Sequence, residues 1–353
     1  GTASVVNTTL TASGISNLGN EAVTISDTTI SASDLNTLDG NTSGAINAST
    51  VTKITGSAAD ANTAYGSSGI TGLGNEVVVI NDTSVAASVL TTLDGHTTGP
   101  VNAHTVTTIT GAAADANTAY ASAGLAGLDS ETVTLSDTTL AASVLNTLDG
   151  YTTGAVNASS VTTLTGTASV VNTAYSSNGI TGLGNEAVTL SGNTSVANAN
   201  TTAGNTTGVV TATISEGDAS TLKTLNETTN AYSITITDTS VSGADLNTID
   251  GATTATVTAI AVTTITGTAA AANTAYASSG ISGLGNEAVT LSDTTLAVAA
   301  LNTLDGNTTG AVNAATVTTL TGGAAAMNTA YASNGITGLA NEATTLDDTS
   351  LAV

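Results

Sequence analysis

The sequence predicts a repeat solenoid, mainly β, in which parallel strands and short helices stack in about two coils per 55-residue repeat. Three observations predict this class: a fixed period, an internal half-repeat, and a near absence of large aromatic side chains. A Leu-Asp-Gly or Ile-Asp-Gly marker recurs at spacings, by subtraction, of 55, 55, 101 and 55 residues; its glycines are Gly40, Gly95, Gly150, Gly251 and Gly306. The glycine before an AADANTAY-like segment gives the same period, at Gly1, Gly56, Gly111, Gly166, Gly267 and Gly322. The longer spacing therefore indicates one regular repeat and one shortened, diverged repeat.

Each repeat divides into two halves with the same order of residue types. One half begins at Gly179 with ITGLGNEAVTL, and the other begins at Gly154 with AVNASSVTTLT. In both halves a glycine precedes a short apolar pair, a β-branched run, a polar turn, and an alanine-rich stretch that contains Asn-Thr. The predicted structural unit is therefore about 27 residues long and is used twice per repeat.

Within one unit the residue types predict a strand, a turn, a short helix and a return strand. The VTL run alternates β-branched and polar residues, which is typical of a half-buried strand. The Ser-Asp-Thr segment that starts at Ser26 has the chemistry of a turn or a helix N-cap. Residues 141–148 carry Val144, Leu145 and Leu148 at helical spacing, and the glycine that follows is a helix terminator. Because one unit buries too little apolar surface alone, about 13 coils are expected to stack at about 4.8 Å per coil, over a length on the order of 60 Å.

The composition favours a narrow core over a thick one. The 353 residues include 7 Tyr but no Trp, Phe or Cys. A compact globule of this length normally fills its core with aromatic side chains. Intrinsic disorder is the rival interpretation of so much Gly, Ser, Thr and Asn. The 40% of hydrophobic residues, placed periodically, favours a folded array.

The charge excludes several classes of function. With 2 Lys+Arg against 26 Asp+Glu, the formal net charge is −24, so the chain has no basic patch for nucleic acid or for a membrane surface. The absence of Cys excludes a disulfide framework and a thiolate metal site. No apolar run is long enough to span a bilayer, and no signal peptide begins at Gly1. Neither end reads as a capping unit, so we expect a segment of a longer chain, or subunits that cap one another end to end.

The predicted organisation is one continuous solenoid over residues 1–353. Its repeats are 1–55, 56–110, 111–165, 166–266 (one regular and one degenerate repeat), 267–321 and the partial repeat 322–353. The pattern degrades from Ser191 to about Ser240, where the alanine-rich segment becomes EGDASTLKTLNETTNAY. We expect one altered coil or a bulge there; a domain boundary is the alternative, although no charged or proline-rich linker is present.

The phrases ISGLGNEAVTLSDTTLAVAALNTLDGNTTGAVNA (residues 281–314) and TGTAAAANTAYASSGI (residues 266–281) carry a resemblance. They resemble repeats of very large secreted cell-surface proteins of bacteria, particularly marine cyanobacteria, which are grouped with haemolysin-type calcium-binding and adhesin-like giants. The resemblance covers essentially the whole chain and implies a location outside the cell. The glycine-rich nonapeptide of calcium-binding repeats is absent here, so calcium roles do not carry over.

Acidic residues recur in register, and two interpretations stay open. They are Glu21, Glu76, Glu131, Glu186, Glu287 and Glu342; Asp27, Asp82, Asp137, Asp293 and Asp348; and Asp39, Asp94, Asp149, Asp250 and Asp305. Calcium held between coils is one interpretation, because hard cations take carboxylate and carbonyl oxygens. Solvated turn and cap residues are the other, since like charges about 10 Å apart in water cost only about 0.4 kcal/mol. Calcium is the one cofactor that the sequence leaves open.

A recurring asparagine predicts a ladder in which side-chain amides bond the backbone of the adjacent coil. Its members are Asn36, Asn146, Asn247 and Asn302 in one half, with Thr91 in one copy, and Asn7, Asn62, Asn117, Asn172, Asn273 and Asn328 in the other. A tolerated turn conformation is the alternative.

Other candidate residues point to no chemistry. Threonine rows such as the one that starts at Thr107 reflect β propensity rather than a flat ice- or glycan-binding array. His96 and His104 occur in one repeat only, and we interpret them as surface variation rather than a metal pair. Sequons such as those at Asn41 and Asn157 permit glycosylation. We assign no catalytic, cofactor-binding or metal-binding residue, and no enzyme activity.

The predicted function is structural: a repeat segment of an extracellular filament, sheath or surface layer that assembles by stacking of solenoid subunits. The exposed strand edges of end coils template such association. The expected partner is the chain itself, as an end-to-end homopolymer, with glycans or other cell-surface components left open. The alternative is the stalk or ligand-contacting region of a giant bacterial adhesin.

Overall fold

The structure is a computed structural model and describes residues 1–348. These residues form two compact units. Unit 1 comprises Gly1–Leu164 and Thr173–Leu183, and unit 2 comprises Thr165–Asn172 and the described residues from Gly184 on. The prediction of one continuous array over 1–353 stays a prediction, and its last five residues lie outside the described residues.

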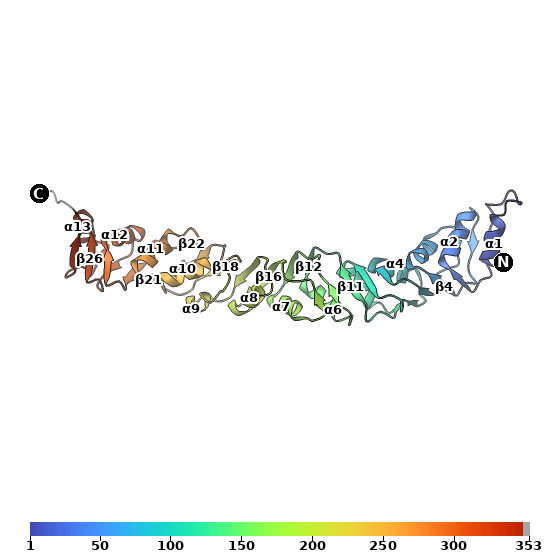
Figure 1. Ribbon diagram of the computed structural model, residues 1–353, viewed down its shortest axis with the longest axis horizontal. Coiled ribbons are helices and arrows are strands. Elements are labelled where there is room, and N and C mark those ends of the chain that lie inside the picture. Colours follow the sequence, from blue (N-terminus) through green and yellow to red (C-terminus); the bar gives the residue numbers. More distant parts are fainter. Residues whose placement is uncertain (349–353) are drawn as a thin grey trace. The chain divides into compact units, whose positions relative to one another are not determined.

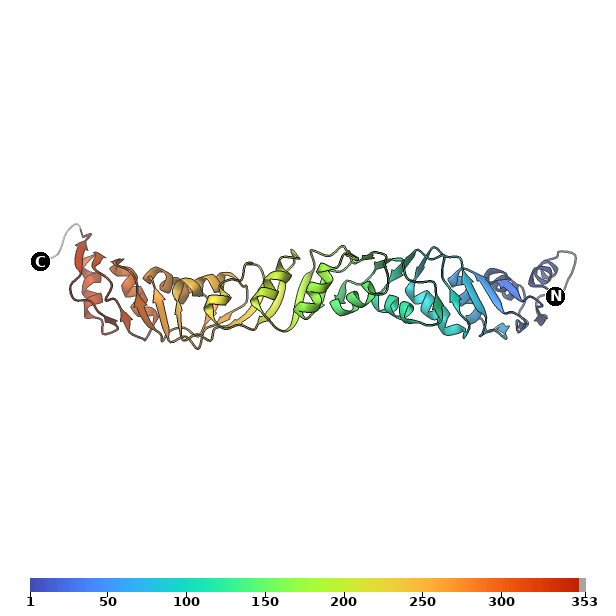
Figure 2. The same cartoon turned by 90° about the horizontal axis from the view of Figure 1, so that it is seen from below.

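Short helices recur along both units, one for each predicted half-repeat, and most consecutive helices within a unit pack side by side (Figures 1 and 2). Their bounds are α1 (Ala3–Leu10), α2 (Ala32–Asn41), α3 (Ala58–Gly66), α4 (Ala87–His96), α5 (Ala113–Ala121), α6 (Ala142–Asp149), α7 (Ala168–Ser176), α8 (Val196–Ala203), α9 (Ala219–Leu222), α10 (Gly243–Gly251), α11 (Ala269–Ala277), α12 (Val298–Asn307) and α13 (Ala324–Ala332). The predicted unit of about 27 residues is therefore confirmed as one strand-and-helix coil.

In unit 1 the strands form three parallel sheets. The first is β1 (Val23–Thr24), β3 (Ile46–Asn47) and β5 (Ile70–Thr71). The second is β2 (Thr29–Ser31), β4 (Lys53–Gly56), β6 (Val77–Ile80), β8 (Val101–Asn102) and β10 (Leu125–Ala126). The third is β7 (Ser84–Ala86), β9 (Thr108–Gly111), β11 (Thr132–Leu135), β13 (Val156–Asn157) and β15 (Ile180–Thr181). A further strand of unit 1 is β12 (Thr139–Ala141), and β14 (Thr163–Gly166) has residues in both units.

Unit 2 repeats this arrangement. One run of parallel strands is β16 (Ala187–Thr194), β17 (Val210–Ile214), β18 (Ala231–Thr235), β20 (Val257–Thr258) and β22 (Ile281–Ser282). The next sheet is β19 (Ser240–Ser242), β21 (Thr264–Gly267), β23 (Ala288–Leu291), β25 (Val312–Asn313) and β27 (Ile336–Thr337). The last is β24 (Thr295–Ala297), β26 (Thr319–Gly322) and β28 (Ala343–Leu346).

The strand register explains why each sheet is short. In the regular repeats the paired residues lie 24 or 23 positions apart, as in Thr29↔Lys53 (53 − 29) and Val78↔Val101 (101 − 78). Between β16, β17 and β18 the offset is 22 or 20, as in Val188↔Val210 (210 − 188) and Thr211↔Ala231 (231 − 211). Successive helices are spaced by half of the 55-residue repeat, which is about 27 residues. From one coil to the next, the paired strand residue therefore falls three to four residues closer to the preceding helix. A sixth strand after Leu125 would fall at residue 149 (125 + 24), which is the last residue of α6. Each sheet therefore ends, and a new one starts one repeat later.

This register corrects the predicted fold class. Parallel strands that alternate with short helices are confirmed, but the strands are two to eight residues long and a helix occupies every coil. The fold is an α/β repeat rather than a mainly-β one. The mainly-β prediction was wrong on this point, because helices of four to ten residues share every coil with the short strands.

The core is a thin apolar layer between helices and strands. In α6 the side chains of Ala142, Leu145 and Leu148 are buried, and they follow one another at three-residue spacing along one helix face. The alternate helices α3, α5 and α11 present only alanines to this layer, as Ala113 and Ala116 do in α5, whereas α7 and α13 add Val171 and Met327. Small residues bring those helices close to the strands, so few aromatic side chains are needed to fill the space.

The asparagine ladder is confirmed within each unit. The fifth residue of one helix donates its side-chain amide to the carbonyl of the third residue in the next helix, as Asn62 does to Val89 at 2.9 Å. The same bond joins Asn7 to Asp34, Asn36 to Asp60, Asn117 to Val144, Asn247 to Ala271, Asn273 to Ala300 and Asn302 to Ala326. A helix carbonyl has a second lone pair, so this bond adds to the helical one and fixes the register between coils.

Thr91 occupies the ladder position in α4, where its hydroxyl donates to Ser88 within the same helix. We expect Thr91→Asn to supply the missing bond to the carbonyl of Asp115 and to raise the free energy of unfolding by about 1 kcal/mol. The shift of the urea midpoint followed by circular dichroism measures this gain. Thr92→Asn, one position along on the exposed side, is the control and should leave the midpoint unchanged. Equal midpoints for both variants would contradict the ladder as a source of stability.

The diverged segment forms one altered coil within unit 2. Its helix α9 has four residues, and the register of β16 with β17 shifts between Thr189 and Asn193, so the expected altered coil and bulge are both present. Tyr232 takes the place of a recurring glutamate: the hydroxyl of Thr253 donates to the Tyr232 carbonyl at 2.9 Å, as Thr308 does to Glu287 at 2.7 Å. The fully buried Tyr232 ring fills core space beside the shortened helix.

Candidate functional site: the acidic series and the altered coil

The recurring acidic residues are the strongest candidates for a function, and the structure separates them into three sets. The Glu series is Glu21, Glu76, Glu131, Glu186, Glu287 and Glu342. The cap series is Asp27, Asp82, Asp137, Asp293 and Asp348. The Asp-Gly series is Asp39, Asp94, Asp149, Asp250 and Asp305. Each set has its own protein partners.

The Glu series closes a turn inside its own coil. The Oε2 atom of Glu76 accepts from the backbone N–H of Gly74 at 2.8 Å and of Asn75 at 3.1 Å. It also accepts from the hydroxyl of Tyr65 at 2.8 Å, which comes from the end of α3. Glu76 is 0% exposed, so these charge-assisted bonds replace its hydration. Tyr120 pairs with Glu131, Tyr276 with Glu287 and Tyr331 with Glu342 in the same way.

The interpretation of this series as solvated residues is therefore wrong for four members. Glu76, Glu131, Glu186 and Glu287 are all buried. The sequence held a signal for the pairing, because the tyrosine of each AADANTAY-like segment precedes its glutamate by a constant 11 residues. That spacing does not by itself show that the intervening loop brings the two side chains together.

The cap series joins one coil to the preceding one. Asp82 Oδ2 accepts from the backbone N–H of Ala58, in the first turn of α3, at 2.8 Å. Asp27, Asp137 and Asp293 accept from Ala3, Ala113 and Ala269 at the same distance, and Asp348 accepts from Ala324 at 2.6 Å. First-turn N–H groups have no partner in their own helix and carry partial positive charge. The predicted cap chemistry is thus confirmed, although the capped helix lies 24 residues earlier in the chain.

The Asp-Gly series joins one coil to the following one. The Oδ2 atom of Asp39 accepts from the hydroxyl of Ser67 at 2.7 Å, and Asp94, Asp149, Asp250 and Asp305 accept from Ser122, Ser177, Ser278 and Ser333. A β-carbon on Gly69 would lie 2.2 Å from Asp39 Oδ1, so a larger residue at this crossing would displace the Asp39 carboxylate from its bond with Ser67.

These partners separate the carboxylates instead of gathering them. Among residues 1–348, no three His, Cys, Asp or Glu side chains form a group that could hold a metal ion. Calcium prefers six to eight oxygen ligands, and the separated carboxylates do not match that donor set. Calcium binding stays an untested prediction.

The histidines lie apart and have separate neighbours. The ring of His96 stacks on that of Tyr65, with centroids 5.6 Å apart. In the next repeat Tyr151 stacks on Tyr120 at 5.9 Å. His104 Nδ1 lies 2.6 Å from the Oδ1 atom of Asn102. The His96 position therefore contributes packing between coils.

The threonine rows and the candidate sequons also serve the fold. Thr107 donates its hydroxyl to the Thr83 carbonyl, which lies in the preceding coil. Asn41 donates its amide to Asn7, and Asn157 accepts from the backbone N–H of Ser159. These side chains help to hold coils together or to close turns.

Burial perturbs several tyrosines. Burial, with the Glu76 carboxylate as hydrogen-bond acceptor, raises the pKa of Tyr65 well above its usual range; burial likewise raises the pKa of Tyr120 and of Tyr276. Burial raises the pKa of Tyr232 to about 12. In each case the folded state favours the neutral phenol, because the phenolate would lose hydration.

The folded chain should therefore unfold in alkali. A folded pKa above the unfolded value of about 10 means that the stabilisation is complete below pH 10 and is lost as the pH rises toward 12. Circular dichroism and the tyrosinate absorbance of the buried tyrosines, titrated together, should change in one transition. Tyr232→Phe is expected to reduce the loss of unit 2 stability between these pH values. A phenolate transition near pH 10 that involves more than the exposed Tyr151 and Tyr331, with intact secondary structure, would contradict this.

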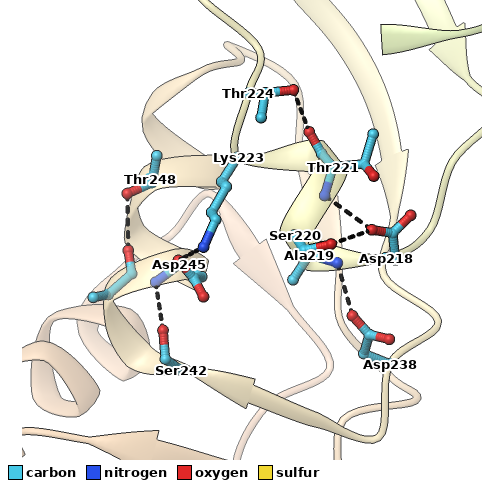
Figure 3. Close-up of polar contacts among 11 residues, drawn as sticks. Asp218, Ala219, Ser220, Thr221, Lys223, Thr224, Asp238, Ser242, Asp245 and Thr248 are labelled. Carbon is cyan, nitrogen blue, oxygen red and sulfur yellow. Dashed lines mark hydrogen bonds and ion pairs between the residues drawn. The ribbon is translucent and has the colours of Figure 1, made fainter.

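The altered coil differs from the regular coils in its polar contacts (Figure 3). Asp218 caps its own short helix at the N–H of Thr221, and Asp238 accepts from Ala219 at 2.7 Å. Lys223 at the end of α9 forms an ion pair with Asp245 of α10 at 3.1 Å. Beside this coil lies a polar cavity of about 370 Å³, lined by Glu227, Asn230 and neighbouring threonines.

No protein-family model, curated protein or solved structure matches this chain. Within residues 1–348, none of the helices has the length and apolar character needed to cross a membrane.

Proposed function

We propose that the chain is a structural repeat segment of an extracellular filament, sheath or surface layer, in which its coils form a solenoid. The observation that carries this proposal is the use of the recurring polar side chains. The ladder asparagines, the cap series and the Asp-Gly series all bond to an adjacent coil. These recurring residues thus bond one coil to the next, as a structural array of stacked repeats requires.

The resemblance to repeats of large secreted bacterial surface proteins supports a location at the cell surface. The net charge of −24 supports solubility outside the cell and disfavours anionic partners. The composition also suits that setting, because Cys is absent and Met occurs once, which leaves few side chains that oxidise readily.

The proposed partner is a second copy of the chain, which stacks on it in the same parallel register that joins successive coils. Each coil offers the next one a strand edge and a ladder amide, as in the pairing of Ile54 with Val78 and the bond from Asn62 to Val89. A second copy carries the same groups and can present them to the first.

Negative-stain electron microscopy of the purified chain, with added calcium or with a chelator, tests the proposal. We expect fibres whose length grows with protein concentration in both conditions. Discrete particles of one length at every concentration would contradict self-assembly and favour the adhesin stalk. Loss of fibres on chelation alone would show that calcium is needed.

A further inference from the structure

We propose that the Lys223–Thr224 peptide bond is a processing site, cut in the folded protein by extracellular proteases that cleave after basic residues. This proposal rests on the extracellular location proposed above, but not on the structural role. The chain of 353 residues contains only two basic residues, Lys53 and Lys223, so such a protease has two candidate bonds. The fold places the two lysines in very different backbone environments.

Lys53 lies within a sheet. It begins β4, where it pairs with Thr29 on one side and with Val77 on the other. Its backbone N–H donates to the Thr28 carbonyl at 3.0 Å, and the Val77 N–H donates to Thr52 at 3.0 Å. A protease binds its substrate as a separate extended strand. Presenting Lys53 would therefore require three strands to part.

Lys223 lies where regular structure stops. It follows a single-turn helix, and residues 223–230 form neither helix nor strand. Residues 226–229 are all exposed. The local bonds to be released include Lys223 N–H to Ala219 and Thr224 N–H to Thr221. Two further bonds join the segment to the Asn200 side chain, which donates to the Thr224 carbonyl at 2.8 Å and accepts from the Asn226 N–H at 3.2 Å. Exposed irregular segments with few bonds are preferred sites of nicking.

The lysine side chain is available as well. Its ammonium group pairs with Asp245 at 3.1 Å, but the two side chains are 41% and 30% exposed (Figure 3). An exposed ion pair of this kind is weak. The carboxylate of a protease specificity pocket can therefore replace Asp245 as the partner.

Cleavage would leave the two fragments associated, because residues before the cut bond to residues after it. Strand β17 precedes the cut and β18 follows it, and the two pair through Thr211↔Ala231 and the next two residues. The Asn230 side chain accepts from the Val210 N–H at 2.7 Å, and Asp238 accepts from Ala219 at 2.7 Å. Unit 2 thus stays assembled with one open bond.

Limited digestion of the folded chain with trypsin tests the proposal. We expect fragments 1–223 and 224–353, which separate on a denaturing gel and co-elute in gel filtration. Lys223→Gln should slow cleavage at least 100-fold, and the control Lys53→Gln should not change the rate. Asp245→Asn should raise the rate by up to about fivefold.

Two results would overturn the proposal. The first is cleavage after Lys53 as fast as after Lys223 in the folded chain. The second is separation of the fragments without denaturant. Digestion of urea-unfolded chain at both lysines provides the reference for intrinsic cleavage rates, so that resistance of the folded chain at Lys223 also counts against the proposal.

Discussion

Gly99→Ala should destabilise its coil by about 3 kcal/mol, an unusually large effect for the addition of one methyl group. A β-carbon on Gly99 would lie 2.3 Å from the carbonyl oxygen of Glu76 and 2.6 Å from its carbon. Both are backbone atoms of the preceding coil, so no side chain can rotate away. The same clash occurs between Gly154 and Glu131, so the crossing is a feature of the repeat. Relief requires the coils to move apart, which breaks the neighbouring hydrogen bonds.

Gly95→Ala is the matched control, four residues earlier in the same repeat. Gly95 lies within α4, and a β-carbon there would meet no atom within 4 Å. Alanine favours a helix over glycine, so this variant should gain about 0.5–1 kcal/mol. Urea unfolding followed by circular dichroism, with hydrogen exchange at α4 to localise the change, compares the two. Equal effects of the two substitutions would contradict the close crossing of coils at Gly99.

Glu76→Ala should cost about 3–5 kcal/mol, because it removes the acceptor of three donors at once. The N–H groups of Gly74 and Asn75 and the hydroxyl of Tyr65 would lose their partner in a buried setting. An unsatisfied buried donor costs about 1–3 kcal/mol, and the bonds lost here are charge-assisted. The loop between α3 and β6 should open in consequence.

Glu227→Ala is the control for loss of one carboxylate. Glu227 is exposed in the altered coil. Its removal should therefore change the free energy of unfolding by less than about 0.5 kcal/mol. Tyr65→Phe added to Glu76→Ala should cost less than it does alone, because the two side chains share one bond. Additive losses in this double-mutant cycle would show that the pair does not act as a unit.

The sequence predicted those features that one coil repeats at a fixed position. The asparagine ladder was predictable because a single side chain recurs at one helix position and an amide is suited to bridging coils. The helix of residues 142–149 was predictable from the spacing of Leu145 and Leu148. Local residue types and one period suffice for such features.

Other features depend on distances that a period does not contain. Paired strand residues lie about 24 positions apart, whereas the half-repeat is about 27 residues long. Strands therefore shift along the sequence relative to the helices, and this shift limits the number of strands in each sheet. The sequence left Glu76 open between a calcium ligand and a solvated turn residue and did not predict its burial, because the burial depends on the hydrogen bond with Tyr65 from α3. The cap series was predicted as caps, but its target in the preceding coil became visible only in three dimensions.

The central claim is that each coil is completed by polar groups of its neighbour, and the amide of Ala58 tests it most directly. Its only described acceptor is Asp82, which lies in the following coil. A first-turn amide without such a partner exchanges with solvent freely. Hydrogen exchange followed by NMR should show Ala58 protected in the native chain, and Asp82→Ala should speed its exchange at least tenfold while the Ala61 amide, bonded within α3, stays slow. Rapid exchange of Ala58 in the native chain, or no change on removal of Asp82, would contradict the account.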